Sequence, residues 1–256
     1  MGKYTYLLID VLTILFPFIL SFDKKVHFYT YWKALFLGIL VVGGVYVCWD
    51  IIFTHLGVWS FNPLYTLSYC YGELPIEEWL FFLVVPYACA FIYKSLAAYF
   101  DIKQASQLFW SLFLVSGIVL LLIGIMFHDR YYTCATMLLA GLVNCLLYIF
   151  RNQLTQFNLR TFLYSFLIAL IPFLIVNGLL TSIPVVLYND AENLGIRIYT
   201  IPVEDVFYGY ALFLGIMLFT KQYYYNRPVV QNFLFETFLD FILQGIGIIF
   251  FMAFML

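Results

Sequence analysis

Charged residues are scarce in this sequence: they make up only 10% of its 256 residues, with 12 Lys and Arg and 14 Asp and Glu. A water-soluble domain carries about 25% charged and about 45–50% apolar residues, whereas 65% of this chain is apolar and its mean hydropathy is +0.98. So few charges cannot cover a soluble globule of this size, and they form no basic block that would bind nucleic acid. The composition excludes a soluble domain and indicates a chain that lies in the lipid bilayer.

The residues that usually hold metals or cofactors are also few. The five cysteines have no CxxC spacing, which predicts neither a zinc site nor a disulfide framework. The three histidines are far apart and show no metal-binding spacing, and no GxGxxG sequence suggests a bound flavin or nicotinamide. A retinal Schiff base is disfavoured because Lys221 lies at the end of the seventh apolar stretch, not in its middle. We therefore predict no cofactor.

Long apolar stretches dominate what is present. A transmembrane helix needs about 20 mostly apolar residues, and eight such stretches lie at 4–22, 34–53, 76–96, 108–127, 131–150, 162–187, 202–220 and 234–256. Because Glu236 and Asp240 lie near the start of the last stretch, the prediction is an all-α integral membrane protein with seven or eight transmembrane helices.

The positive charges are divided unequally between alternate loops. Three of the 12 fall on one side, at Lys3, Arg130 and Arg197, and the other nine fall on the opposite side. Cytoplasmic loops carry an excess of Lys and Arg, so we predict a multi-pass protein of the cell membrane with its N-terminus outside. The charges flanking the first stretch, Lys24 and Lys25, follow it, so we expect a retained span and not a cleaved signal peptide.

The chain matches itself without gaps at an offset of 127 residues. Lys24 falls on Arg151, and Leu-Pro-Ile-Glu-Glu at 74–78 falls on Ile-Pro-Val-Glu-Asp at 201–205. A single span separates the two copies, so both enter the membrane in the same direction and form parallel repeats related by an axis along the membrane normal. The predicted divisions are a first three-helix unit at 1–103, a connecting helix at 104–130, a second three-helix unit at 131–225 and a C-terminal helix at 226–256.

Each unit carries one Pro-x-acid-acid motif, in which a single residue separates the proline from two acids, where an outer loop enters a helix. The pairs are Glu77 with Glu78 and Glu204 with Asp205. Proline suits the first helical position and acids suit the first turn, so a well-formed helix start explains either motif alone. Parallel repeats place both motifs at one depth beside the symmetry axis, which favours a shared functional site.

Other polar and aromatic residues lie at the same outer level. An ionisable residue in a membrane segment suggests function, although Asp50 and Asn177 can also serve as hydrogen-bonding partners between helices. Asp10 has no acidic counterpart, because Met137 falls opposite it. Aromatic residues are common at the headgroup level, and alternatively they line a pocket where their ring faces stabilise a positive charge. The candidate substrate-binding residues are Asp10, Asp50, Trp59, Asn62, Trp79, Asn177 and Asn189.

Three segments of the chain resemble the lycopene cyclase domain family. They are Trp-Ser-Phe-Asn at 59–62, the stretch from Leu74 to Pro86 that contains the first acid pair, and Pro-Val-Glu-Asp at 202–205. The resemblance covers roughly 4–221. Members of this membrane family occur as two subunits or as one fused chain, and the two units here resemble the fused form. The resemblance implies an intramolecular lyase, or isomerase, that cyclises the ψ-ends of lycopene to give γ-carotene and then β-carotene.

This reaction is compatible with the residues, since it needs an acid and a base but no electron transfer. Paired carboxyl groups in an apolar site can divide those two roles, so we predict Glu77, Glu78, Glu204 and Asp205 as the catalytic cluster. The implied partner is the carotenoid itself, and a homo-oligomer or an association with other carotenoid enzymes is compatible with the sequence. Two other functions stay open: a proton- or cation-coupled transporter, which also shows repeats and intramembrane acids, and a non-catalytic carotenoid-binding protein.

Overall fold

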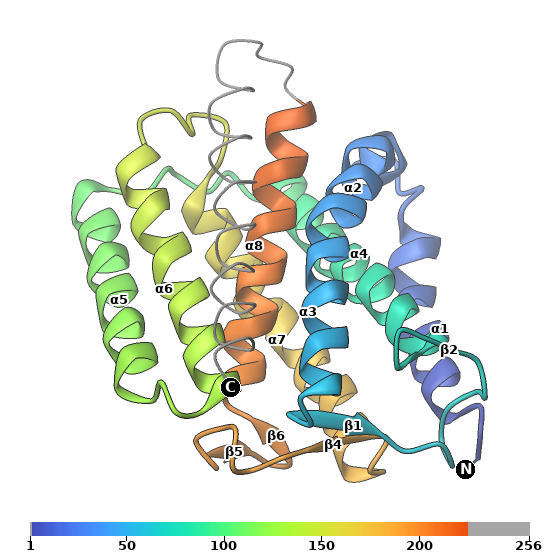
Figure 1. The fold of residues 1–256 in the computed structure, drawn as a ribbon. Coiled ribbons are helices and arrows are strands. Elements are labelled where there is room, and N and C mark those ends of the chain that lie inside the picture. The colour runs from blue at the N-terminus through green and yellow to red at the C-terminus, as the bar shows by residue number, and fades with distance from the viewer. Residues whose placement is uncertain (1, 225–256) are drawn as a thin grey trace.

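The protein is a bundle of helices whose short strands and N-terminus gather at one end (Figure 1). The computed structural model describes residues 2–224, so the predicted span at 234–256 and the predicted C-terminal unit at 226–256 lie outside the described residues. The helices are α1 (Thr5–Leu20), α2 (Trp32–Gly38), α3 (Gly44–His55), α4 (Ile76–Tyr99), α5 (Gln107–Met126), α6 (Tyr131–Phe150), α7 (Leu159–Ser182) and α8 (Glu204–Tyr224).

Five helical segments are long and apolar enough to cross a membrane. They are Phe28–His55, in which a 3₁₀ turn, α2, a π turn (Ile39–Gly43) and α3 follow one another, together with α4, α5, α6 and α7. The first and seventh predicted stretches also form helices, α1 and α8, which are not among these five; α1 has only 16 residues. Several large apolar side chains of α1 and α5 are exposed, among them Leu12 and Leu112. An outer face of this kind suits lipid, because soluble proteins rarely expose large apolar patches.

The contacts between helices follow one scheme in both halves of the described chain. Helix α1 packs on α4, and α6 packs on α8. Across the halves, α7 packs on α4 and α2 packs on α8. Each helix that begins with an acid pair therefore lies between a helix of its own half and a helix of the other half.

Helices α5 and α6 form a tight hairpin beside this arrangement. A Cβ atom at Gly141 would come within 2.7 Å of the backbone oxygen of Gly117, and one at Gly117 would come within 2.9 Å of the backbone oxygen of Gly141. Only glycine allows two helix backbones to approach so closely. The connecting helix is thus held directly against the first helix of the second half.

Six short strands shape the loops at the end where the acid pairs lie. Strands β1 (Trp59–Phe61) and β4 (Val186–Tyr188) pair in antiparallel register and so tie the two long loops together. Two hairpins precede α4 and α8: β2 (Cys70–Tyr71) with β3 (Leu74–Pro75), and β5 (Arg197–Ile198) with β6 (Ile201–Pro202).

The two motif prolines close these hairpins. Pro75 pairs with Cys70 and caps α4 in an extended conformation, with ψ at 151°, while Pro202 pairs with Arg197. We expected proline at the first helical position, but α4 begins at Ile76 and α8 at Glu204. A proline at the end of a short hairpin is tolerated because the ladder needs no further N–H donor there.

Candidate active site

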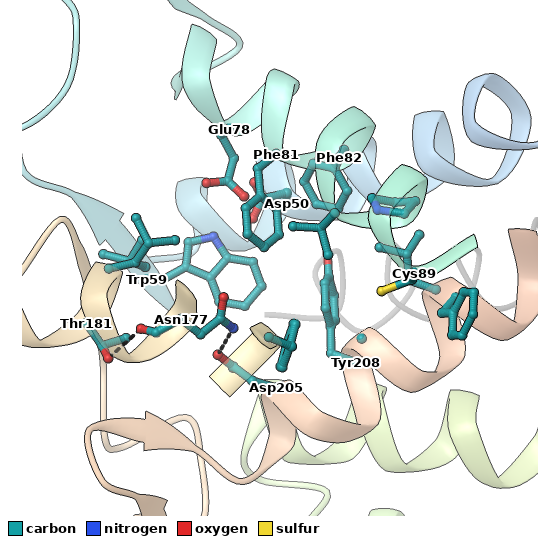
Figure 2. A pocket seen from close by; sticks show the side chains of 18 of the residues that line it. Asp50, Trp59, Glu78, Phe81, Phe82, Cys89, Asn177, Thr181, Asp205 and Tyr208 are labelled. Carbon is teal, nitrogen blue, oxygen red and sulfur yellow. Dashed lines mark hydrogen bonds between the residues drawn. The ribbon is translucent and has the colours of Figure 1, made fainter. Parts of the chain in front are cut away.

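The two acids of each pair point in different directions. Adjacent residues of a helix are about 100° apart, and only Glu78 and Asp205 line the pocket between α4 and α8. Both are almost fully buried, with exposed fractions of 7% and 3%. Figure 2 shows their carboxyl groups entering the pocket from opposite walls. The shared site therefore contains one acid from each pair.

The other two acids, Glu77 and Glu204, hold the loops. Oε1 of Glu77 accepts a hydrogen bond of 2.7 Å from the backbone N–H of Leu67, and Oε1 of Glu204 accepts one of 2.8 Å from Leu194. The Thr133 hydroxyl also donates to Glu204, at 2.6 Å. Both carboxyls are fully buried and neither lines the pocket, so their contacts fit a role in fixing the loop in front of each helix.

Glu78 and Asp205 receive different numbers of hydrogen bonds. The Tyr6 hydroxyl donates to Oε2 of Glu78 at 2.5 Å. Asp205 accepts from the hydroxyls of Tyr132 and Tyr188, at 2.6 and 2.9 Å, and from Nδ2 of Asn177 at 3.2 Å. Donors stabilise a carboxylate, so hydrogen bonding favours the anion of Asp205 more than that of Glu78.

Tyr188 lies on β4, outside the helices. Its burial, together with the negative charge of Asp205, raises the pKa of the Tyr188 hydroxyl well above its ordinary value. The hydroxyl therefore keeps its proton and acts as a permanent donor to Asp205.

The tyrosine contacts reveal a shift in the internal match. Tyr6 and Tyr132 play equivalent parts, as they donate to the second acid of each pair, and they are 126 residues apart. The strands of the hairpins, by contrast, recur at an offset of 127. In the first helix of each half the match is thus displaced by one residue, so that the counterpart of Asp10 is Thr136 and not Met137.

The pocket is mostly apolar and aromatic apart from its acids, Asn177 and Thr181. Side chains from strands β1 and β4 and from helices α1, α3, α4, α6, α7 and α8 line it. Four rings, those of Trp59, Tyr132, Tyr188 and Tyr208, cluster beside Asp205, and the Trp59 and Tyr132 ring centroids are 5.1 Å apart. The aromatic rings Phe81, Phe82, Phe166, Phe173 and Phe213 extend the wall.

Asp50 is the third carboxyl group of the pocket. It projects from α3 next to Glu78 (Figure 2) and is only 3% exposed. Its Oδ2 has no hydrogen-bond partner among residues 2–224. Asn177, at the corresponding position of the second half, also lines the pocket. Of the predicted substrate-binding residues, Asp50, Trp59 and Asn177 therefore meet at this site.

The other four predicted substrate-binding residues lie outside the pocket lining. Asp10 is buried in α1, with an exposed fraction of 2%, and interacts electrostatically with Glu78. Asn62 and Asn189 accept hydrogen bonds from backbone N–H groups two residues later and so shape turns. The Trp79 indole donates to the backbone oxygen of Tyr71 at 3.3 Å on the outer surface.

Several pocket residues escaped the sequence analysis. The gapless match at an offset of 127 residues does not align Tyr6 with Tyr132, so it gave no sign that the two tyrosines are equivalent. Tyr208 and Thr181 lie within apolar stretches and show no motif.

No group of three or more His, Cys, Asp or Glu side chains that could hold a metal ion occurs in the part of the chain that the structure describes.

Of the comparisons with known proteins, one found a match. No curated protein and no solved structure matches the chain. The family model described as lycopene cyclase matches the chain twice, over residues 3–96 and 129–223. The starts of the two matches are 126 residues apart and their ends 127, which is the same one-residue shift. Each match contains one acid pair and the tyrosine donor of its first helix, Tyr6 or Tyr132. Together they cover more than half of the sequence, so the chain belongs to the lycopene cyclase family.

Proposed function

We propose that this protein cyclises the ψ-ends of lycopene to β-rings in the membrane, giving γ-carotene and then β-carotene. One observation carries the proposal: carboxyl groups from both halves of the chain, Glu78 and Asp205, enter one apolar, aromatic pocket. Lycopene is a hydrocarbon, so it needs an apolar site, and its cyclisation needs an acid and a base within that site.

The reaction is an isomerisation in which atoms and charge balance. The acid gives a proton to the terminal double bond, which leaves a tertiary carbocation. The next suitable double bond attacks this cation and closes a six-membered ring, and the base removes a proton from the ring. Burial keeps water from trapping the cation, and the ring faces near Asp205 stabilise it by cation–π attraction. Glu78 and Asp205, which enter the pocket from opposite walls, supply the acid and the base.

The architecture that suits this proposal is a pair of parallel three-helix units, 1–103 and 131–225, joined by the helix within 104–130. The equivalent packing of α4 and α8 and the equal spacing of the hairpins support this arrangement. We further propose seven or eight transmembrane helices and an N-terminus outside the cell membrane. The charge bias of the loops supports that orientation.

A coupled transporter is the less suitable function. Its ion and substrate sites lie near the bilayer midplane, at discontinuous helices. Here the carboxyls Glu78 and Asp205 lie in the first turns of α4 and α8, at the end where the strands gather. A role as a carotenoid-binding protein without activity would not call for two opposed carboxyls in the pocket.

Expression in a lycopene-accumulating bacterial host tests the function directly. We expect red lycopene to be converted to orange β-carotene by the natural chain and by Asp129→Asn, a control in an exposed loop. Unchanged lycopene at a normal membrane level of the protein would refute the cyclase. Unchanged pigment with altered ion uptake would instead support a transporter.

A further inference from the structure

The two halves of the protein differ in how many carboxyl groups they bury. The first half buries Asp10, Asp50, Glu77 and Glu78. In the second half, Thr136 and Asn177 occupy the positions of Asp10 and Asp50, so that among the described residues of this half the buried acids are Glu204 and Asp205. The buried residues of the described chain include no lysine, arginine or histidine. Four buried carboxyls without a buried cation cannot all be ionised, so the first half retains protons.

Within the first half, the pocket itself contains Asp50 and Glu78. The two interact electrostatically, and Figure 2 shows them side by side. Neighbouring carboxyls hold at least one proton between them, because two adjacent negative charges in an apolar site repel strongly. Among the described residues, Oδ2 of Asp50 has no hydrogen-bond partner and Tyr6 is the one side chain that donates to the Glu78 carboxyl.

Asn177, which corresponds to Asp50 in the second half, has the opposite effect on its neighbouring acid. Asn177 cannot ionise, and its Nδ2 donates to Oδ2 of Asp205. Tyr132 and Tyr188 add two further donors. A neutral amide in place of an acid thus gives Asp205 a hydrogen-bond donor where Glu78 has an acidic neighbour, and this donor favours the Asp205 anion.

We infer that the two halves have separate chemical roles: Asp50 and Glu78 act together as the proton donor, and Asp205 acts as the base. This inference rests on the proposed cyclisation and makes Asp50 a member of the catalytic machinery. Glu78 or Asp50 transfers a proton to the terminal double bond, and the pair then carries one more negative charge. Asp205 takes the proton that the ring releases, and transfer of a proton back to the pair restores the starting state.

Deuterated water separates the two roles experimentally. An enzyme that can protonate the double bond but cannot remove the ring proton forms the cation reversibly, so it places deuterium in the lycopene that is recovered. An enzyme that cannot protonate the double bond returns unlabelled lycopene. We propose to incubate membranes containing lycopene and the natural chain, Asp50→Asn, Glu78→Gln, Asp205→Asn or the control Asp129→Asn, and to analyse all pigments by mass spectrometry.

We expect labelled β-carotene from the natural chain and from the control. Asp50→Asn and Glu78→Gln should lower cyclisation by about 100-fold or more and return unlabelled lycopene. Asp205→Asn should also abolish β-carotene but return labelled lycopene. Asp50→Glu keeps the carboxyl group and should restore part of the activity, which a purely structural role for Asp50 does not require.

Other results would overturn the inference. Cyclisation by Asp50→Asn at the natural rate, or labelled lycopene recovered from it, would remove Asp50 from the donor. Unlabelled lycopene from Asp205→Asn together with labelled lycopene from Glu78→Gln would reverse the two roles. If Asp50→Asn does not accumulate in the membrane, Asp50→Leu, which suits apolar surroundings, replaces it. Its cyclisation rate and the label in its recovered lycopene are interpreted by the same criteria. Failure of the natural chain to cyclise lycopene would refute the proposed function itself, which is a different outcome from each of these.

Discussion

The first and second halves of this protein present similar helices to one pocket but surround their acids differently. Glu78 has one tyrosine donor and a second carboxyl, Asp50, beside it. Asp205 has two tyrosine donors and the amide of Asn177. Duplication alone would give two equivalent acids, whereas protonation and deprotonation of one substrate need two unlike groups. A few neighbouring side chains can therefore give two otherwise similar units different acid–base surroundings.

The largest expected effect comes from replacing the acid of each pair that lines the pocket, Glu78 or Asp205. Glu78→Gln and Asp205→Asn keep the size and most hydrogen bonds of each side chain but cannot exchange a proton. General acid–base catalysis contributes about 10²–10⁴-fold, so we expect each variant to lose β-carotene formation by that factor. Pigment analysis at matched membrane levels measures the effect, and near-natural conversion by both variants would show that these acids are structural.

A second test makes the second half resemble the first. Asn177→Asp replaces the amide donor of Asp205 by an acid, so the anion loses a hydrogen bond and gains a like charge. A hydrogen bond to a charged group contributes about 1.5–3 kcal/mol, which corresponds to a fall in cyclisation of about 10- to 100-fold. Asn189→Asp makes the same exchange on an exposed turn and should retain activity. Equal activity of the two variants would contradict the asymmetry.

The loop-facing acids should affect stability more than chemistry. Glu77→Ala and Glu204→Ala each leave the N–H of a loop residue without its acceptor, at a cost of about 1–3 kcal/mol. Glu204→Ala should cost more, because Glu204 also accepts from Thr133. Thermal inactivation in detergent checks both variants. Loss of all activity in a variant with natural thermal stability would place that acid in the reaction.

The smallest expected effect comes from removing a single hydrogen-bond donor of Asp205. Tyr188→Phe removes one of the three hydrogen bonds to Asp205 and leaves those from Tyr132 and Asn177. Unlike Asn177→Asp, this change adds no negative charge beside Asp205, so we expect a smaller net loss of about 0.5–1.5 kcal/mol, which corresponds to roughly a two- to tenfold lower rate of cyclisation. Initial rates in membranes measure this change. A loss as large as that of Asp205→Asn would mean that the hydroxyl itself takes part in proton transfer.

Much of the helical framework follows from the sequence, because long apolar stretches leave few alternatives in a membrane. The meeting of the two acid motifs could also be predicted, from duplication and the direction of the spans. The choice between Glu77 and Glu78, or between Glu204 and Asp205, depends on the rotation of each helix against its neighbours, which the motif does not encode. In the structure the second acid of each pair, Glu78 and Asp205, lines the pocket.

The polar residues outside the pocket were harder to interpret from sequence. Asn62 and Asn189 occur in aromatic loops that face the pocket, yet asparagine bonds readily to its own backbone two residues on, and both do so here. Trp79 follows Glu78 directly, so the turn of the helix directs it away from the pocket. Tyr6 and Tyr132 could have been found only by allowing a one-residue gap in the internal match.

The pairing of β1 with β4 has a consequence for the order of events during synthesis. Strand β1 leaves the ribosome early, but its partner follows only after α4, α5, α6 and α7 have been made. Trp59, which forms part of the pocket wall, therefore stays without its neighbour Tyr188 until the second half enters the membrane. The nascent first half therefore lacks a complete pocket, and under the proposed cyclisation no carbocation can form until the second half closes the pocket around the substrate.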